Sequence, residues 1–450
     1  MFLGCSPQFF PTHLPFWPEI PPGVWGLAPN VVLFGGWPPM LSCLRAGPQL
    51  ALDKCLILRA NASMDLHATY PALSDLRRRA QRRIPKFVWE YLDSGTGDEA
   101  TKARNRSDLD QIGMMPAVLG GEFTPDLSTS LFGQTLPLPF GFSPIGMSGL
   151  IWPDAEGHLA RAAAKAGIPY SLSTVATQSP EDLAPHLGDH GWFQMYPPRD
   201  PEIRKDMLER AKTAGFNTLI LTVDVPVASR RERQVRSGLT NPPRLTPRLM
   251  AQVAMRPAWA MGMVRRGMPH MRMLDKYTSD ATANLSPTAH VGYLLRTAPD
   301  WDYVKWLRDH WDGPFVIKGV LRPEDAAQLQ TLGVDGIWVS NHAGRQFDGA
   351  PSSIAALPGI RAATNLPVIF DSGVESGLDI LRALALGADY VMLGRAAHFA
   401  LAALGPKGVD HLIDLLSKDL SANMGQLGAT DLKNLPAPMA LTENPVKPAP

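Results

Sequence analysis

Cysteine is scarce in this 450-residue chain. The three cysteines, Cys5, Cys43 and Cys55, all precede Met64, so the remaining sequence offers neither a disulfide framework nor a thiolate metal site. We therefore predict no metal site. A reducing, cytoplasmic setting fits this cysteine usage.

Long apolar runs and a strong net charge are also lacking. No stretch approaches the roughly eighteen uninterrupted apolar residues of a membrane-spanning helix. The formal net charge is +1, which gives no general electrostatic reason to bind nucleic acid. With 45% hydrophobic residues the chain can still bury a large core, so we expect a globular protein without a nucleic-acid partner.

Residues 1–63 contain few acidic residues and show no regular helical or strand periodicity. This segment is crowded with Pro and Gly, and Glu19 and Asp53 are its only acidic residues. It also lacks the charged start and continuous apolar run of a secretory signal. We expect it to be disordered or not part of the natural product, with Met64 as the true start; the alternative is an extension that docks on the body of the protein. The Pro-rich residues 431–450 are expected to form a disordered tail.

A repeated unit dominates the sequence after about residue 130: a short apolar run, a polar or Gly-containing turn, and a helical pattern. Eight such repeats favour a (β/α)8 TIM barrel over an open doubly wound sheet. No GxGxxG follows the first apolar run, which also disfavours a dinucleotide fold. The predicted strands are Leu136–Phe142, Ile168–Leu172, Trp192–Tyr196, Thr218–Val223, Pro314–Ile317, Gly336–Val339, Pro367–Phe370 and Tyr390–Leu393. The helical segments include Glu156–Ala166, Pro201–Ala214, Pro323–Leu332 and Leu378–Leu386.

The barrel is predicted to span residues 131–430, behind an N-terminal helical flank of residues 64–130. Within the flank, Tyr70–Tyr91 reads as one or two helices, with Pro85 opening the second and Ser94–Asp98 ending it. A long insertion, about residues 232–299, follows the fourth strand and precedes a helix near Trp301–His310.

Polar side chains follow almost every predicted strand. The most informative is the stretch Ser340–Gln346, because His342 can move a proton near neutral pH and Arg345 can hold a carboxylate with two parallel hydrogen bonds. Taken alone, the pair has a purely structural alternative: His342 could satisfy the end of a strand and Arg345 could form a surface ion pair. A ring of polar groups at the carboxyl ends of barrel strands instead predicts an active site. The ring comprises Ser173, Gln194, Tyr196, Thr222, Asp224, Lys318, Ser340, His342, Asp371, Gly394 and Arg395.

Several separated motifs together resemble the FMN-dependent family that oxidises 2-hydroxy acids, which includes glycolate oxidase, L-lactate dehydrogenase and mandelate dehydrogenase. The resemblance covers roughly Tyr70 to Gly428 and implies a (β/α)8 barrel that binds FMN. The motifs are Pro85–Tyr91, Phe193–Tyr196, Leu221–Asp224, Ile317–Gly319, Ser340–Asp348, Asp371–Gly373 and Leu393–Arg395.

The resemblance implies a catalytic role for four residues. His342 is the base, and Asp224 pairs with its imidazolium, which a carboxylate favours. Tyr196 hydrogen-bonds the hydroxyl or the developing carbonyl. Lys318 lies near the flavin N1–C2 carbonyl and offsets negative charge on the reduced ring. Substrate binding is implied for Tyr91, Tyr196, Arg231 and Arg345.

The resemblance also implies which residues hold FMN. Pro144, Ile145 and Gly146 run along the flavin. The ring or ribityl chain is bound by Ser173, Gln194, Thr222 and Ser340. The ribityl and phosphate end is held by Asp371, Ser372, Gly373, Gly394 and Arg395.

This sequence departs from the family pattern at two positions, and a third position distinguishes the oxidase members from the dehydrogenase members. Glu375 stands where the family usually has an Arg that donates to the FMN phosphate, so we expect Glu375 to point away, Arg395 to carry more of the charge, and FMN affinity to be lower. Val175 replaces an aromatic residue found in several members, which should widen the substrate pocket. Gly146 stands where oxidase members tend to have Ala and dehydrogenase members have Gly, which favours a dehydrogenase.

The part of the insertion from Arg244 to Met273 contains no acidic residue. Basic residues interleaved with Met and Trp predict a peripheral membrane contact, on the inner face of the cytoplasmic membrane. The segment also resembles the corresponding loop of membrane-bound mandelate and lactate dehydrogenases, which pass electrons to a quinone. A mobile lid or an oligomer contact is the alternative. Its marked residues are Arg248, Met250, Met255, Arg256, Trp259, Met261, Met263, Arg265, Arg266, Met268, Met271, Arg272 and Met273.

The leading hypothesis is FMN-dependent oxidation of an L-2-hydroxy acid, lactate- or mandelate-like, to the 2-oxo acid, with electrons passed to a quinone or another non-oxygen acceptor. The alternatives are an oxidase that produces hydrogen peroxide and a phosphate-binding barrel without flavin. A homo-oligomer, a tetramer by analogy, is expected. The sequence does not choose among substrate side chains, or between hydride transfer and proton abstraction at the α-carbon.

Overall fold

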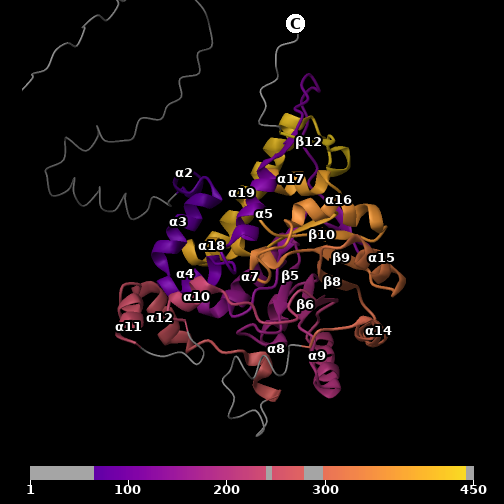
Figure 1. The fold of residues 1–450 in the computed structure, drawn as a ribbon. Helices are drawn as coiled ribbons and strands as arrows, with labels where there is room; N and C mark the ends of the chain where they lie inside the picture. Colours follow the sequence, from indigo (N-terminus) through magenta and orange to yellow (C-terminus); the bar gives the residue numbers. More distant parts are fainter. Residues whose placement is uncertain (1–64, 240–245, 278–296, 442–450) are drawn as a thin grey trace, which may run out of the picture. The chain divides into compact units, whose positions relative to one another are not determined.

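Eight parallel strands close into a barrel at the centre of the structure (Figure 1). The computed structural model describes residues 65–239, 246–277 and 297–441. Each strand pairs in parallel with the next along the chain, and the last pairs with the first, so the predicted (β/α)8 barrel is confirmed. The barrel strands are β4 (Phe140–Phe142), β5 (Tyr170–Ser173), β6 (Gly191–Met195), β7 (Thr218–Thr222), β8 (Phe315–Val320), β9 (Gly336–Val339), β10 (Val368–Phe370) and β11 (Tyr390–Leu393).

The first barrel strand is shorter than predicted. Residues 134–136 instead form β3 (Gln134–Leu136), which pairs antiparallel with β2 (Thr129–Leu131) in a hairpin. Pro137 and Pro139 separate β3 from β4, and proline has no N–H to donate to a ladder. The prediction of one continuous strand Leu136–Phe142 is therefore wrong.

The β2–β3 hairpin helps to fill one end of the barrel. Leu131 and Leu136 are buried in one cluster with inward-facing strand residues such as Trp192, Trp338 and Tyr390. The ring of Phe132 lies 5.9 Å from that of Trp192. Because large side chains fill the interior, as in other barrels of this kind, the space available for chemistry lies at the carboxyl ends of the strands.

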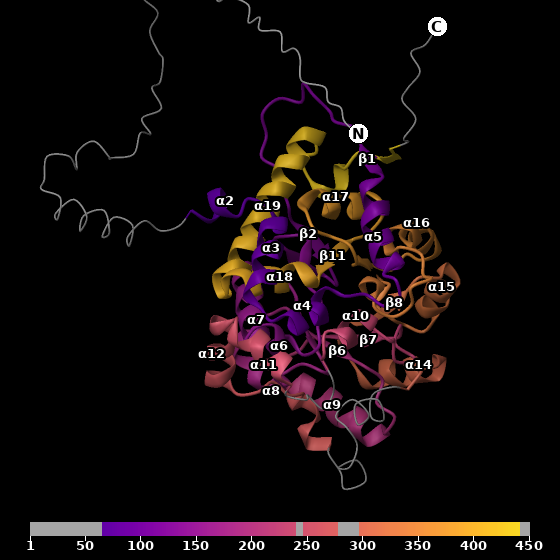
Figure 2. The ribbon, with the colours of Figure 1, turned by 60° about the vertical axis from the view of Figure 1, so that its left-hand side comes forward.

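Helices surround the barrel on its outer side (Figures 1 and 2). Most begin with a side-chain cap or a proline and end at a glycine or a polar turn. They are α6 (Ser148–Ile151), α7 (Ala155–Ala166), α8 (Pro180–Leu183), α9 (Pro201–Thr213), α14 (Trp301–His310), α15 (Pro323–Thr331), α16 (Ser353–Ala363), α17 (Gly377–Ala385), α18 (Arg395–Leu404) and α19 (Pro406–Leu427).

The N-terminal flank packs against the last helices of the barrel. It contains α2 (Leu66–Thr69), α3 (Leu73–Arg83), α4 (Lys86–Asp93) and α5 (Ala100–Asp110). α3 buries Leu73, Leu76 and Ala80 and packs on α18, while Pro85 stands immediately before α4, as predicted. The helix α5 was not predicted, because its exposed face is almost entirely polar and its apolar signal is weak.

The insertion after β7 forms short helices that pack on the body of the protein. They are α10 (Glu232–Arg236), α11 (Pro247–Ala254), α12 (Pro257–Arg266) and the 3-10 helix η3 (Arg272–Tyr277). Trp259 on α12 is buried, donates from Nε1 to the carbonyl oxygen of Leu150 at 3.0 Å, and meets the ring of Phe87 edge-on. Within the described residues, no helix is long and apolar enough to cross a membrane.

The C-terminal residues 431–441 correct the prediction of a disordered tail. They include the 3-10 helix η5 (Leu432–Asn434) and β12 (Pro438–Ala440), which pairs antiparallel with β1 (Ile112–Met114). Pro438, one of the prolines that suggested disorder, begins the edge strand β12, a position where proline is tolerated. The predictions for residues 1–63 and for the end of the tail, residues 442–450, lie outside the described residues.

Candidate active site

His342 and Asp224 form a hydrogen-bonded pair at the carboxyl end of the barrel. Asp224 follows β7 and His342 follows β9, and their Nδ1 and Oδ1 atoms are 3.0 Å apart. Burial opposes ionisation of Asp224, but the charges of His342 and Lys318 outweigh it and lower the pKa of the carboxyl. Burial also lowers the pKa of His342, against the opposing effect of Asp224. The resting pair is a neutral imidazole beside a carboxylate, with the proton on Nδ1 assigned from this contact.

The backbone around His342 is held in an uncommon conformation. His342 and Ala343 have φ values of 56° and 55°, in the left-handed region. The side chain of Asn341 accepts from the N–H of Gly344 at 3.2 Å, and it exchanges amide hydrogen bonds of 2.7 and 2.9 Å with Asn105 on α5. The flanking helix therefore fixes the loop that carries His342.

A glycine lets Asp224 approach the barrel wall. Gly319 has a φ of 104° and lies at a register shift in β8, between Lys318 and Val320. A Cβ atom on Gly319 would stand 2.6 Å from the Cβ of Asp224, so any side chain here would displace the carboxylate.

Arg345 is a cation with no carboxylate partner in the described part of the chain. Its Nη1 donates to the carbonyl oxygens of Tyr91 at 2.9 Å and Ser94 at 2.8 Å, and its guanidinium carbon lies 5.6 Å from the centre of the Tyr91 ring. Burial, together with the charge of Arg231, lowers the pKa of Arg345 to about 9. The guanidinium stays charged at neutral pH, and its position favours an incoming anion.

Two tyrosines complete this cluster. Tyr91 donates its hydroxyl to the carbonyl oxygen of Gly146 at 2.8 Å. Burial raises the pKa of Tyr91, opposed by Arg345 and Arg231, and burial with the charge of Asp224 raises that of Tyr196. Both phenols therefore remain donors at neutral pH. The structure brings six predicted residues into one electrostatically coupled group: Tyr91, Tyr196, Asp224, Arg231, His342 and Arg345.

A buried lysine lies beside this group. Lys318 on β8 donates to the hydroxyl of Ser340 at 2.8 Å, and its Nζ is 3.3 Å from the Oδ2 of Asp371. Ser372 donates its hydroxyl to the other carboxylate oxygen of Asp371 at 2.8 Å. The lysine charge is thus kept inside the protein by one carboxylate and one hydroxyl.

Several buried polar atoms near the strand ends have no partner within the described residues. They are the Nε2 of Gln194, the Oγ1 of Thr222, the Oγ of Ser143 and the Nε of Arg395. Gln194 is oriented by Ser173, whose hydroxyl donates to its Oε1 at 2.8 Å. Because buried polar groups are normally hydrogen-bonded, these atoms fit a cofactor with a polar ring and an anionic chain, as FMN has.

The predicted phosphate end is assembled where β11 meets α18. Gly394 directly precedes α18, and the side chain of Ile145, after β4, lies 3.5 Å from the position of a Cβ on Gly394. Arg395 donates from Nη2 to the carbonyl oxygen of Ala343 at 2.7 Å. Glu375 lies 3.7 Å from the Nη1 of Arg77 at a partly exposed position. This end therefore offers an anion the start of a ten-residue helix and a half-buried guanidinium whose Nε has no partner within the described residues.

Gly373 has a packing role. It has a φ of 90°, and a Cβ there would stand 2.6 Å from the carbonyl oxygen of Asn105. The close approach of α5 therefore accounts for this glycine without a ligand. Pro144, Ile145 and Gly146 follow β4, as predicted.

Two residues were missed by the sequence analysis. Ser143 could have been found, because it directly follows β4 in the same way that the other ring residues follow their strands. Asn105 carried no signal, since its partner Asn341 lies 236 positions away.

Gly146 and Val175, which were noted separately in the sequence, are neighbours. A Cβ on Gly146 would stand 2.5 Å from the Cγ2 of Val175. The space that an alanine would need is therefore already occupied, and the two positions act together on the shape of this part of the site.

Known proteins resemble this chain over most of its length. Residues 80–441 match the family model described as FMN-dependent dehydrogenase. An L-lactate dehydrogenase of Acinetobacter baumannii is 41% identical over 367 residues, covering 81% of this chain and 96% of that protein. An L-lactate dehydrogenase of Ectopseudomonas mendocina is 40% identical over 375 residues, covering 83% and 99%.

Solved structures agree with the fold. The crystal structure of a monotopic membrane protein, (S)-mandelate dehydrogenase, has a TM-score of 0.78 at 36% identity and covers 82% of this chain and 99% of its own. A mandelate oxidase with 3,3-difluoro-2-hydroxy-3-phenylpropionic acid has a TM-score of 0.67 at 33% identity, covering 81% and 97%.

Proposed function

This chain belongs to the family of FMN-dependent 2-hydroxy-acid dehydrogenases, and we propose that the group around His342 is its catalytic site. The protein is an oxidoreductase that uses FMN to oxidise an L-2-hydroxy acid. One observation carries the site assignment: the loop after β9 carries both His342, which is paired with Asp224, and the cation Arg345, which has no carboxylate partner among the described residues. A base and an anion clamp on one rim are what a hydroxy acid needs.

Substrate binding is assigned to the cationic part of the group. Arg345 and Arg231 supply positive charge for the substrate carboxylate, and Tyr91 supplies a hydroxyl donor beside them. Tyr196 directly follows β6 at the same rim, with Asp224 and the arginines near it, and its hydroxyl is assigned as the donor to the substrate hydroxyl. Held at both groups, the acid presents its α-carbon in one orientation.

Proton transfer is assigned to His342. Its Nδ1 faces Asp224, which leaves Nε2 as the free acceptor for a proton from the substrate. The lowered pKa keeps the ring neutral and ready to accept at neutral pH. After proton transfer, the carboxylate of Asp224 stabilises the imidazolium.

FMN, when bound, supplies the two-electron oxidation. Lys318 places a buried positive charge at the strand ends, where it would face the polar edge of the ring together with Gln194 and Thr222. Gly394 and Arg395 would hold the phosphate end, with Ser173, Ser340, Asp371 and Ser372 ordering the groups between.

The proposed activity is tested by anaerobic reduction of the purified yellow protein. We expect L-2-hydroxy acids to bleach the absorbance near 450 nm, while their D-enantiomers leave it unchanged and the corresponding hydroxy amides bleach it far more slowly. A panel from lactate to mandelate ranks the side chains that the pocket accepts. Protein that is colourless, or that no L-2-hydroxy acid bleaches, would contradict the assignment and favour the flavin-free phosphate-binding barrel.

The electron acceptor is proposed to be a quinone or another non-oxygen acceptor. Gly146 supports this, because it stands where dehydrogenase members have Gly, and the mandelate oxidase shows that an oxidase can share this fold. Admitting air to the bleached protein decides between them in the same cuvette. Slow return of colour without peroxide supports a dehydrogenase, and fast return with stoichiometric peroxide identifies an oxidase. We further propose a homo-oligomer, a tetramer by family analogy, which light scattering of the purified protein tests.

A peripheral membrane contact is proposed for α11 and α12, at the inner face of the cytoplasmic membrane. These helices expose Met250, Met261 and Val264, the last of which is 80% exposed, and Met255 and Met268, just after the helix ends, are exposed as well. Arg248 and Arg265 are exposed on the same two helices. Exposed apolar side chains with arginines on the same helices are typical of a helix that lies in a lipid interface, and a monotopic membrane protein is among the structural neighbours.

The double substitution Met255→Gln/Met261→Gln tests this contact. Deleting the whole segment would open the core, because Trp259 and Met263 are buried. Met255 and Met261, in contrast, are 61% and 53% exposed, so replacing them leaves the core intact. We expect the variant to sediment less with vesicles of phosphatidylcholine and phosphatidylglycerol than the wild-type protein does, with unchanged dye-linked turnover. Met115→Gln/Met439→Gln, at exposed positions near β1 and β12, is the matched control. Equal sedimentation of all three proteins would exclude α11 and α12 as the contact.

A further inference from the structure

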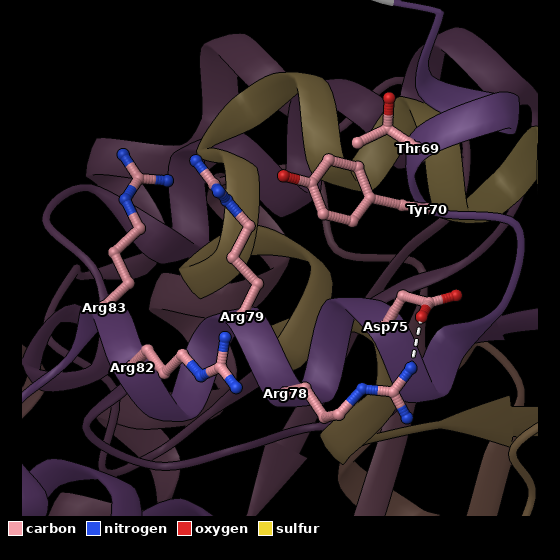
Figure 3. Close-up of a pocket in the computed structure, with 7 residues that line it drawn as sticks. All are labelled: Thr69, Tyr70, Asp75, Arg78, Arg79, Arg82 and Arg83. Atoms are coloured by element: carbon pink, nitrogen blue, oxygen red, sulfur yellow. Dashed lines mark hydrogen bonds and ion pairs between the residues drawn. The ribbon is translucent and has the colours of Figure 1, made fainter.

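A pocket lined by four arginines lies on α3, apart from the strand ends that hold the active site (Figure 3). It has a volume of about 480 Å³, within the range of small-molecule sites. Asp75 is the only carboxylate among the described residues that line it. The lining is completed by Thr69, Tyr70, Arg78, Arg79, Arg82 and Arg83.

Two of the arginines are fixed in place by uncharged groups. Arg79 donates from Nε to the carbonyl oxygen of Ala403 at 2.9 Å, and Arg83 donates to the same oxygen at 2.7 Å. Their guanidinium carbons lie 5.4 Å from the ring centre of Tyr70 and 4.3 Å from that of Trp152, respectively. Carbonyls and rings order these side chains without cancelling their charge by an ion pair.

The remaining two arginines extend along the other side of the pocket. Arg78 is paired with Asp75, and its side chain is 64% exposed. Arg82 has no hydrogen bond or ion pair within the described residues and is exposed. Figure 3 shows Arg79 and Arg83 side by side, with Arg79 next to Tyr70, and with Arg82 and Arg78 below them on the helix.

This arrangement carries an uncompensated positive charge. Arginines three and four residues apart on one helix repel one another, and here four share a single surface with one carboxylate. Burial lowers the pKa of Arg83, and the charge of Arg79 lowers it further. Arg79 and Arg83 have a structural role, because they donate to a carbonyl oxygen in the last turn of α18. In the described part of the chain Arg78 and Arg82 make no such contact, so this role does not account for their presence.

The pocket adjoins the proposed membrane contact. Ile84, the residue after Arg83, accepts from the Nε of Arg256 at 3.2 Å, and the N–H of Phe87 donates to Gln252 at 3.1 Å. The end of α3 therefore lies against α11 and α12, and both overall views show these helices below α3 (Figures 1 and 2).

We propose that the α3 pocket binds the phosphodiester headgroup of an anionic lipid, while the exposed methionines of α11 and α12 enter the same membrane. Several planar guanidinium groups with a tyrosine hydroxyl match phosphate oxygens, to which arginine binds with two parallel hydrogen bonds. Lipid is favoured over a free anion because the pocket borders an apolar, exposed surface. The proposal rests on the membrane contact proposed above.

Vesicle sedimentation of the full-length holoenzyme tests the pocket. The variant Arg78→Gln/Arg82→Gln keeps Arg79 and Arg83, which hold α3 against α18. The fold should therefore be retained, and unchanged dye-linked turnover checks that it is. We expect binding to vesicles of phosphatidylcholine mixed with phosphatidylglycerol to fall on the order of ten-fold or more, and binding to pure phosphatidylcholine to stay unchanged. Lys305→Gln/Arg322→Gln removes the same charge from exposed positions at α14 and α15, on the other side of the barrel, and should bind as the wild-type protein does.

Calorimetric titration with glycerophosphoglycerol, the headgroup without its acyl chains, separates the pocket from the membrane contact. Saturable binding to wild-type protein that is absent from Arg78→Gln/Arg82→Gln supports the pocket, even if no vesicle binds. Equal vesicle losses in the pocket and control variants would show a diffuse charge effect and overturn the pocket while leaving the membrane contact intact. Tighter binding of inorganic phosphate than of the diester would overturn the lipid assignment.

Discussion

Replacing His342 with glutamine is expected to lower kcat/KM for an L-2-hydroxy acid by on the order of 10²- to 10⁴-fold, the usual contribution of a positioned proton acceptor. Glutamine retains a polar side chain of similar length but accepts no proton at neutral pH. Absorbance near 450 nm and FMN affinity should remain, because the residues proposed to hold FMN are other ones. Stopped-flow bleaching under anaerobic conditions measures the effect without any electron acceptor. Substantial residual bleaching would remove His342 from the role of base.

The pH dependence gives this prediction a second, independent measurement. The pKa of His342 is lowered, by burial first, so the neutral form needed for catalysis persists into mild acid. The acid limb of the kcat/KM profile should therefore have its midpoint at a pH below about 6.5, the ordinary pKa of histidine. Activity should rise as the pH increases through that midpoint. Asp224 raises the pKa of His342, so Asp224→Asn should shift the limb further toward acid while lowering the plateau. A limb that moves toward alkali in Asp224→Asn would contradict the proposed pairing.

The strands were predictable because buried parallel strands are short apolar runs separated by helical patterns. β9 and β11 have the predicted bounds, and most other barrel strands differ from the prediction by one to three residues at an end. The largest error came at Pro137 and Pro139, where local chemistry interrupts an otherwise apolar run. The helix α5 was missed because its apolar face is narrow and its anchoring contacts are made with a loop far along the chain.

The active-site residue types were predictable, but their mutual geometry was not. Strand exits marked Asp224 and His342 as members of one rim, although the strand β8 separates β7 from β9. Their contact depends on the backbone of Gly319 and on the left-handed conformation of His342, neither of which has a local sequence signal. The Asn105–Asn341 pair that supports this conformation joins residues 236 positions apart. Such support becomes visible only when the fold brings distant segments together.

The amphipathic insertion shows a different limit. Its Met, Trp and Arg content predicted a lipid contact, but composition did not separate side chains that face solvent from those that pack inward. Trp259 and Met263 are buried, while Met255 and Met261 are exposed. The arginines of α3 were predicted only as part of a helix, because their convergence with Tyr70 and the end of α18 is a tertiary feature.

Replacing Arg345 with methionine is expected to remove most of the recognition of the substrate carboxylate. Truncating one member of a buried, hydrogen-bonded charge pair costs about 2–5 kcal/mol, which corresponds to roughly 30- to 4,000-fold in kcat/KM. Within the described residues the guanidinium donates only to the carbonyl oxygens of Tyr91 and Ser94, so its charge is left to pair with the substrate carboxylate. The methionine variant also leaves those two carbonyl oxygens without their donor. Arg345→Lys is therefore the matched comparison, because lysine keeps the positive charge with fewer hydrogen-bond donors.

The substrate offers the complementary change. Wild-type protein should oxidise a 2-hydroxy acid far faster than the corresponding 2-hydroxy amide, since only the acid carries the charge that Arg345 and Arg231 recognise. Arg345→Met should lose most of this preference, because its rate with the acid falls while its rate with the amide changes little. Arg345→Lys should lie between the two. If the methionine variant kept the full preference for the acid, the carboxylate would have to be held elsewhere, and the cluster around Tyr91 would lose its assignment as the substrate clamp.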